Sequence, residues 1–309
     1  MTASEETLEV GLVLPLEETH MGGGTARWDD LVEMAVEAES VGFDSVWVSD
    51  HLMLHNEGEP IHGAWECWSL AAALAGRTTT IRIGTQVTSA SFRHPGLLAR
   101  IVDTVDEISG GRLIVGIGAG DHEPEYVSLG LPFRDRVGRA EDYLTAFTEL
   151  LRAGRSDHQG PHFQLSNFEM PLRGPRLGGI PIVIAAEGPR MLRVAARYAD
   201  GWMTFDKSRE QQTGLEARFV DACKLEGRTS TSIGRVRAGV VIRFSDQASV
   251  PWASAPALTG TPSEIAESLQ AMHAEGASTV LTWPDPNSIT GIRAMRPVLE
   301  YLHAVGTTT

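Results

Sequence analysis

Short hydrophobic runs alternate with helical patterns along the whole chain. Each run is nearly unbroken, which is typical of strands that are buried on both faces of a parallel sheet. We predict eight such strands, at Glu9–Leu14, Ser45–Val48, Ile81–Val87, Leu113–Ile117, Pro181–Ala185, Gly201–Phe205, Arg237–Phe244 and Ser278–Trp283.

Apolar residues recur at helical spacing between these runs. One stripe is formed by Leu98, Ile101, Val102, Val105 and Ile108, and another by Leu144, Phe147 and Leu151. A capping box with proline at its first helical position, Thr261-Pro262-Ser263-Glu264, predicts where a third helix begins. Further helices are predicted at 29–41, 64–76, 189–198, 208–226 and 290–304.

Eight strands that alternate with eight helices in 309 residues predict a (β/α)8 barrel, the TIM barrel, as a single domain. A doubly wound sheet with a second domain is the alternative. Two segments do not fit the repeat and are predicted insertions, at about 155–180 and 245–260. Functional residues of a barrel lie where strands end and loops begin. This selects Asp50 with His51 and the segments 84–94, 118–125 and 186–190.

The formal charge of −14, from 40 acidic and 26 basic residues, limits the range of partners. Such a chain lacks the basic surface that nucleic acid or an anionic membrane needs, so a phosphate-bearing ligand requires local arginines or backbone N–H groups. Cys67 and Cys223 have neither metal-ligand nor disulfide spacing, and we expect no metal site. The first residues lack signal-peptide features, and no apolar run is long enough to span a membrane. We therefore expect a cytoplasmic protein.

Four short motifs follow one another along the chain. They are FDSVWVSDH at 43–51, GTQV at 84–87 with FRHP at 92–95, GGRL at 110–113 with GIGAG at 116–120, and AARYADGW at 195–202. Together they resemble the luciferase-like flavin and deazaflavin oxidoreductases. The resemblance extends from about residue 9 to residue 304 and implies the luciferase-like form of the barrel.

The pair Asp50-His51 separates two branches of that family. Enzymes that use FMN commonly have Glu-His-His here, whereas enzymes that use coenzyme F420 commonly have Asp-His. The resemblance therefore implies F420, with Asp50 at the polar edge of the deazaflavin. His51 can exchange a proton near neutral pH, which makes it the first candidate catalytic residue. From the residues alone, Asp50 capping a turn and His51 in a solvated loop remain an alternative.

The segment after the third predicted strand corresponds to the place where F420 enzymes carry a cis peptide bond beneath the ring. The resemblance implies this bond between Gln86 and Val87, so that both residues contact one face of the cofactor. Ser89 corresponds to a hydroxyl that contacts the cofactor in the family's sugar-phosphate dehydrogenase. A regular strand is the alternative.

The glycine-rich run at 116–120 is not a dinucleotide fingerprint, because its third glycine comes too early. By resemblance, Ala119 and Gly120 line the cofactor, and Pro124 lies where the family often places a polar contact. Asp121 corresponds to a catalytic carboxylate and is the second candidate catalytic residue. An acidic surface loop is the alternative.

The turn after the fifth predicted strand, AAEGPRM at 185–191, precedes a helix that begins with proline. Exposed N–H groups and the positive end of a helix favour a phosphate there. The resemblance implies cofactor contacts from Glu187, Gly188, Arg190 and Met191, with the side chain of Glu187 turned away from the phosphate. Arg193 would add positive charge. An ordinary helix that begins with proline is the alternative.

Three functions remain open at this point. The first is an F420-dependent oxidoreductase that transfers a hydride between the deazaflavin and a small molecule. The others are a two-component FMN monooxygenase on the same barrel and a non-catalytic deazaflavin-binding protein. The family's sugar-phosphate dehydrogenase binds its substrate phosphate with two lysines and an arginine, so the resemblance disfavours a sugar phosphate for a chain whose only lysines are Lys207 and Lys224. Phe163 and Trp252, in the two insertions, favour a more apolar substrate, and a homodimer is one assembly open to the chain.

Overall fold

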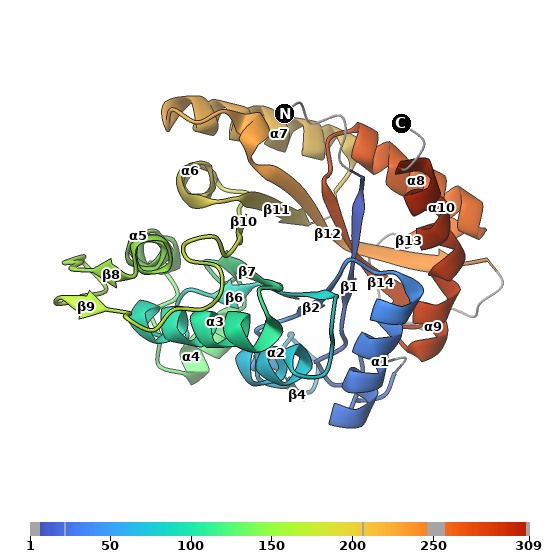
Figure 1. The fold of residues 1–309 in the computed structure, drawn as a ribbon, viewed down its shortest axis with the longest axis horizontal. Helices are drawn as coiled ribbons and strands as arrows, with labels where there is room; N and C mark the ends of the chain where they lie inside the picture. The colour runs from blue at the N-terminus through green and yellow to red at the C-terminus, as the bar shows by residue number, and fades with distance from the viewer. Residues whose placement is uncertain (1–6, 22, 206, 246–256, 307–309) are drawn as a thin grey trace.

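The computed structural model describes residues 7–21, 23–205, 207–245 and 257–306. Eight parallel strands form a closed barrel, in which β10 pairs with both β7 and β11 (Figure 1). In order around the barrel these strands are β1 (Glu9–Val13), β2 (Ser45–Val48), β5 (Arg82–Thr85), β7 (Leu113–Gly118), β10 (Ile182–Ala185), β11 (Gly201–Phe205), β12 (Gly234–Phe244) and β14 (Thr279–Asp285). The predicted TIM barrel is confirmed.

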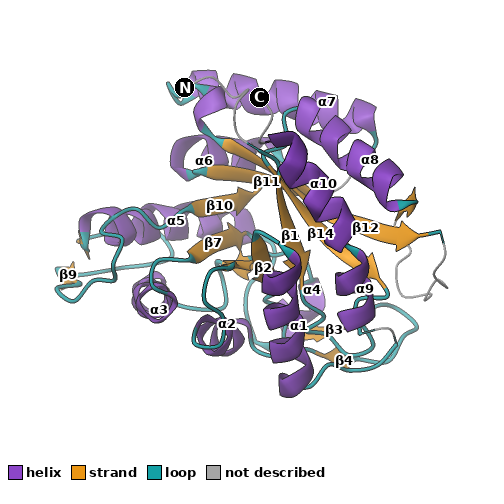
Figure 2. Ribbon diagram, turned by 45° about the vertical axis from the view of Figure 1, so that its right-hand side comes forward, coloured by secondary structure: helices purple, strands orange, loops and turns teal. Residues whose placement is uncertain are grey.

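Helices surround the barrel on its outer side (Figure 2). They are α1 (Trp28–Val41), α2 (Cys67–Ala75), α3 (Pro95–Ser109), α4 (Glu123–Ser128), α5 (Arg136–Ala153), α6 (Pro189–Tyr198), α7 (Arg209–Leu225), α8 (Pro262–Ala274), α9 (Ile289–Ala294) and α10 (Arg296–Gly306). Short strands lie outside the barrel order: β3 (Met53–Leu54) with β4 (His62–Gly63), β6 (Thr88–Ser89), β8 (Arg155–Ser156) with β9 (Phe168–Glu169), and β13 (Ala257–Gly260).

The predicted strand boundaries differ from the structure in two instructive places. β12 begins at Gly234 instead of Arg237, because its first residues already pair with β11. The predicted strand Ile81–Val87 ends at Thr85, and the following bond between Gln86 and Val87 is cis. The chain then pairs with β7 again as β6. The cis bond that the family resemblance implied is thus present.

A small apolar cluster fills the barrel, with Trp47 as its largest side chain. The indole lies where a side chain on Gly11 or Gly84 would otherwise be, so those two positions require glycine. Its Nε1–H donates to Ser45 Oγ at 2.8 Å, which satisfies the only polar atom of the ring. The larger cluster lies between the strands and the surrounding helices.

The first insertion packs against α5 and does not reach the barrel mouth. The carboxylate of Asp142 accepts hydrogen bonds from the backbone N–H groups of His162 and Phe163 and contacts the ring of His158. Phe163 is therefore a core residue, 8% exposed, in contact with Tyr143. Phe163 lies outside the lining of the cavity at the barrel mouth, so it gives no support to the expected apolar substrate. Trp252, in the second insertion, lies outside the described residues.

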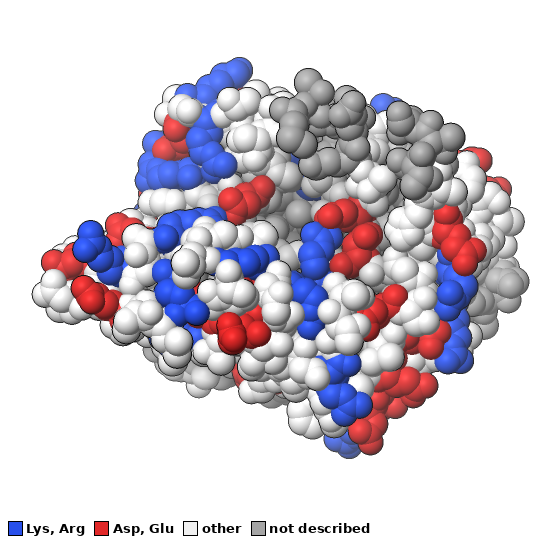
Figure 3. All heavy atoms as spheres, in the orientation of Figure 1, with Lys and Arg blue, Asp and Glu red and all other residues white. Residues whose placement is uncertain are grey.

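Acidic and basic side chains are interspersed on the face shown in Figure 3, with no single basic surface. Within the part of the chain that the structure describes, no helix is long and apolar enough to cross a bilayer. The homodimer stays a prediction.

The close approach of β5 and β7 gives a test of the fold. A Cβ on Gly116 would overlap the carbonyl oxygen of Thr85. We expect Gly116→Ala to lower the free energy of unfolding in urea by about 3 kcal/mol, because the overlap forces the backbone to shift. Gly214→Ala is the matched control, since Gly214 lies on exposed α7 with open space around it. There alanine should raise the free energy of unfolding by roughly 0.5–1 kcal/mol, and equal effects at both positions would refute this packing.

Candidate active site

A cavity of about 680 Å³ opens at the carboxyl ends of β5, β7, β10 and β11. Its lining includes every expected catalytic and cofactor-contacting residue except Pro124, and it also lacks Arg193, which was expected to add positive charge. The expected residues in the lining are Asp50, His51, Gln86, Val87, Ser89, Ala119, Gly120, Asp121, Glu187, Gly188, Arg190 and Met191. Segments far apart in the sequence therefore meet where a barrel places its functional residues.

Pro124 does not line this cavity, and its contact with the cofactor stays a prediction. Pro124 lies in the first turn of α4, and that turn brings the next two residues, Glu125 and Tyr126, to the cavity wall. Both side chains are buried. The helix therefore places its acid and its phenol, and not its proline, at the site.

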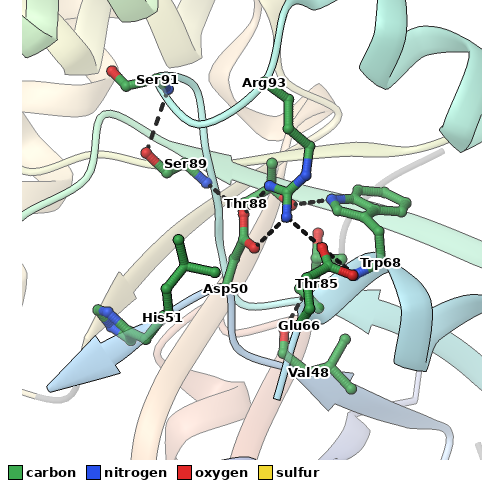
Figure 4. A network of polar contacts seen from close by, with 12 residues as sticks. Val48, Asp50, His51, Glu66, Trp68, Thr85, Thr88, Ser89, Ser91 and Arg93 are labelled. Atoms are coloured by element: carbon green, nitrogen blue, oxygen red, sulfur yellow. Dashed lines mark hydrogen bonds and ion pairs between the residues drawn. The ribbon is translucent and has the colours of Figure 1, made fainter. Parts of the chain in front are cut away.

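The carboxylate of Asp50 is held by neighbouring groups of the protein. Its carboxylate, which is 0% exposed, accepts two hydrogen bonds from Arg93, at 2.7 and 2.9 Å, and one from the backbone N–H of Ser89. Arg93 also pairs with Glu66, whose carboxylate caps the beginning of α2 (Figure 4). Burial lowers the pKa of Arg93, but the bonds to Asp50 and Glu66 outweigh burial and raise it, so the guanidinium stays charged.

His51 points away from this ion pair (Figure 4). Its Nδ1 lies 3.0 Å from a carboxylate oxygen of Glu125, and its side chain is 33% exposed. Burial lowers the pKa of His51, but the Glu125 hydrogen bond and the nearby charges of Glu125, Glu17 and Asp121 outweigh burial and raise it. The imidazole therefore keeps its proton to a higher pH than an ordinary histidine.

Backbone hydrogen bonds hold the carboxylate of Glu125 in position beside His51. The backbone N–H groups of Leu52 and Met53 both donate to its second oxygen. Burial raises the pKa of Glu125, but the hydrogen bonds from His51 and from these backbone groups outweigh burial, so the pKa lies below its usual value. A charged carboxylate thus holds the ring of His51 in one orientation, while Asp121 lies exposed on the same wall of the cavity.

The glycines at the end of β7 make room for protein atoms. A Cβ on Gly118 would press on Val87, and a Cβ on Gly120, whose φ is +80°, would overlap the hydroxyl of Tyr126. That hydroxyl donates to the carbonyl oxygen of Ala119 at 2.6 Å and lies 3.2 Å from Ser89 Oγ. The glycine run therefore lets the segment after β5 and the ring of Tyr126 approach the end of β7.

The turn between β10 and α6 has the features of an anion site. Gly188 is the N-cap of α6, and nothing lies within 4 Å of where its side chain would be. The indole N–H of Trp202 holds the turn by donating to the carbonyl oxygen of Ala186 at 2.8 Å. The side chain of Glu187 pairs with Lys207 at 2.9 Å. An incoming phosphate would therefore meet backbone N–H groups and the positive end of a helix.

Two arginines line the cavity beside this turn. Arg190 donates to Glu141 at 2.8 Å and is 57% exposed. Arg136, at the beginning of α5, donates to the carbonyl oxygen of Gly120 at 2.9 Å, and no carboxylate among the described residues forms an ion pair with it. Arg193 pairs with Glu226 and lies outside the cavity lining, so its contribution of positive charge stays a prediction.

Four important residues of the site were not singled out from the sequence. Arg93 was part of the motif FRHP and Glu125 ended the selected segment 118–125, but neither was given a role. Tyr126 directly follows the selected segment 118–125, and Arg136 lies outside every selected motif. A helix of six residues and a single arginine give no periodic signal, so these contacts emerge only from the fold.

Comparisons with known proteins bear on this arrangement. The chain matches the family described as luciferase-like monooxygenase over residues 8–253. An F420-dependent glucose-6-phosphate dehydrogenase of Amycolatopsis mediterranei is 35% identical over 180 residues, which cover 56% of this chain and 52% of that protein. An F420-dependent hydroxymycolic acid dehydrogenase of Mycobacterium tuberculosis is 30% identical over 233 residues, 73% of this chain and 60% of that protein. The matched regions thus span about half of these relatives' length.

A solved structure, described as an F420-dependent secondary alcohol dehydrogenase in complex with an F420-acetone adduct, has a TM-score of 0.80 to this chain. The superposition covers 96% of this chain and 99% of that chain at 19% identity, which shows a shared fold. Because the family match extends over residues 8–253 of the 309, this chain belongs to the luciferase-like monooxygenase family.

Proposed function

We propose that this protein is an oxidoreductase that transfers a hydride between coenzyme F420 and a small organic substrate. One observation carries the proposal: a single cavity joins the His51–Glu125 pair to the open turn at Gly188. The His51–Glu125 pair can donate or accept a proton, and the turn at Gly188 can bind a phosphate. The names of the relatives and the pair Asp50-His51 point to the same cofactor.

The residues present fit F420 in this cavity. The ring would lie against Val87 and Gln86, and the chain that follows would pass Gly120 toward the turn before α6. The side-chain oxygen of Gln86 is buried without a partner in the structure, so its carboxamide has hydrogen-bonding capacity to spare. Arg136 and Arg190 would bind the phosphate. When bound, F420 supplies hydride transfer at one ring carbon, and the protein supplies orientation and protons.

We assign the accompanying proton to His51. The charge of Glu125 stabilises the protonated ring, and the partial exposure of the ring leaves it accessible from the cavity. General acid–base catalysis of this kind accelerates a reaction by about 10²–10⁴-fold. Asp121 is the second proton-carrying group on the same wall. Asp50 has a different role, because it positions Ser89 and Arg93 and keeps the floor of the cavity in place.

An FMN monooxygenase is the second candidate, since the family is described by that activity. It would use the same cavity and turn. A non-catalytic carrier would keep the turn but would not need the His51–Glu125 pair.

Titration with both cofactors tests the proposal. We expect F420 to bind at least about tenfold more tightly than FMN, or about 1.4 kcal/mol, because its longer phosphodiester tail adds contacts beyond the phosphate. Fluorescence titration of the purified protein with each cofactor measures this ratio. Equal or reversed affinities would favour the monooxygenase.

Charge reversal at the turn tests the placement of the phosphate. Arg190→Glu should weaken F420 binding by roughly tenfold or more, since hydrogen bonds to charged groups contribute about 1.5–3 kcal/mol. A deazaflavin with its ribityl chain but without a phosphate should lose much less. The matched control is Arg193→Glu, the same charge change one turn further along α6 and outside the cavity lining. Equal losses for both ligands, or for both variants, would place the phosphate elsewhere.

The protonation of His51 gives a test that needs no substrate. Because its pKa is raised chiefly through Glu125, the ring loses its proton at a higher pH than an ordinary histidine. Glu125→Gln keeps a hydrogen-bond acceptor but removes the charge, so the pKa should fall and the proton should be lost at lower pH. An NMR titration of ¹⁵N-labelled histidine measures both values. Glu123→Gln, on the exposed side of α4, should leave the pKa unchanged, and an unchanged value in Glu125→Gln would contradict the assignment.

A further inference from the structure

We infer that the substrate of this site is neutral and apolar, and that Phe205 is the side chain that selects it. This inference rests on the proposed function, because it concerns the part of the cavity that F420 would leave free.

Phe205 lies at the barrel mouth. It is the last residue of β11, and side chains two residues apart on a strand lie on the same face. Met203 is 1% exposed and belongs to the cluster inside the barrel, so Phe205 continues that interior face upward into the cavity. Its ring is nevertheless 41% exposed. An aromatic ring left open to water at the end of an apolar face gains free energy when an apolar ligand covers it.

The neighbouring wall is apolar as well. Ala185 pairs with Met203 across β10 and β11, and Val87 and Ala185 both pack against the interior cluster. Met191 adds a further apolar side chain to the same cavity. The proposed cofactor path follows the ends of β5, β7 and β10. Phe205, on the next strand around the barrel, is left for the substrate.

The cationic side chains of the cavity all have partners in the proposed complex with F420. Among the described residues that line it, the only lysine or arginine side chains are Arg136 and Arg190, and the proposed function gives both to the cofactor phosphate. Lys207, in an adjoining cavity, pairs with Glu187. The protonated ring of His51, the remaining cation of the lining, is paired with Glu125. An anionic substrate would therefore find no unassigned cation and would lie near the carboxylates of Asp121 and Glu125. A neutral substrate avoids that cost.

A homologous series of methyl ketones tests the inference on protein saturated with oxidised F420, which cannot reduce them. Binding of 2-pentanone, 2-heptanone and 2-nonanone is measured through the change in F420 fluorescence. We expect affinity to rise by about two- to fourfold for each added methylene. Phe205→Ala should at least halve that increment, and Phe205→Leu should retain most of it. Leu225→Ala removes an apolar side chain that is 74% exposed on α7, outside the cavity, and should leave the series unchanged.

The outcomes separate the two proposals. A protein that does not bind F420 at all overturns the proposed function and this inference with it. Normal F420 binding with affinities that do not depend on ketone length overturns this inference alone. The same holds if glucose 6-phosphate binds more tightly than 2-nonanone, or if the Phe205 variants match the unchanged protein.

Discussion

A single buried cation holds the candidate site together. Arg93 joins Asp50 at the end of β2, Glu66 at the beginning of α2 and, through Asp50, the backbone of Ser89 (Figure 4). A buried charge is tolerated only when it is paired, and removing one partner costs about 3–5 kcal/mol. The end of β2 can therefore take few other positions. The backbone of His51, the next residue along the chain, is therefore also held in place.

The barrel then divides the chemistry among different strands. The end of β2 provides the imidazole to which we assign the proton, and the segment after β5 provides the floor of the cavity. The turn after β10 provides backbone N–H groups, and the last residue of β11 provides an exposed aromatic ring. Each of these depends on its own local contacts, such as the Trp202 bond to Ala186 or the glycines that admit Tyr126. A change at Phe205, the proposed substrate contact, would therefore leave the proposed phosphate site undisturbed.

Most of the fold and much of the site could be predicted from the sequence. Unbroken apolar runs located all eight barrel strands, because a strand buried on both faces has little choice of residue. The motifs located the cavity residues, because strand ends converge in a barrel. What stayed hidden depends on side-chain geometry. Nothing in the sequence indicates that Arg93, far along the chain, engages both oxygens of Asp50, whose contact with the cofactor stays a prediction. In the sequence Phe163 favours an apolar substrate, yet the hydrogen bond from its backbone N–H to Asp142 helps to hold it in the core.

The central claim is that Asp50 organises the cavity while Val87, Arg136 and the turn at Gly188 hold the cofactor. A crystal structure of the protein with F420 bound tests it most directly. The account predicts a ring that rests against Val87, a phosphate at the N–H groups that follow Gly188 and within reach of Arg136, and an ion pair between Asp50 and Arg93 that is unchanged. A complex in which the carboxylate of Asp50 has left Arg93 to bind the ring, or in which the phosphate lies away from α6, would contradict it.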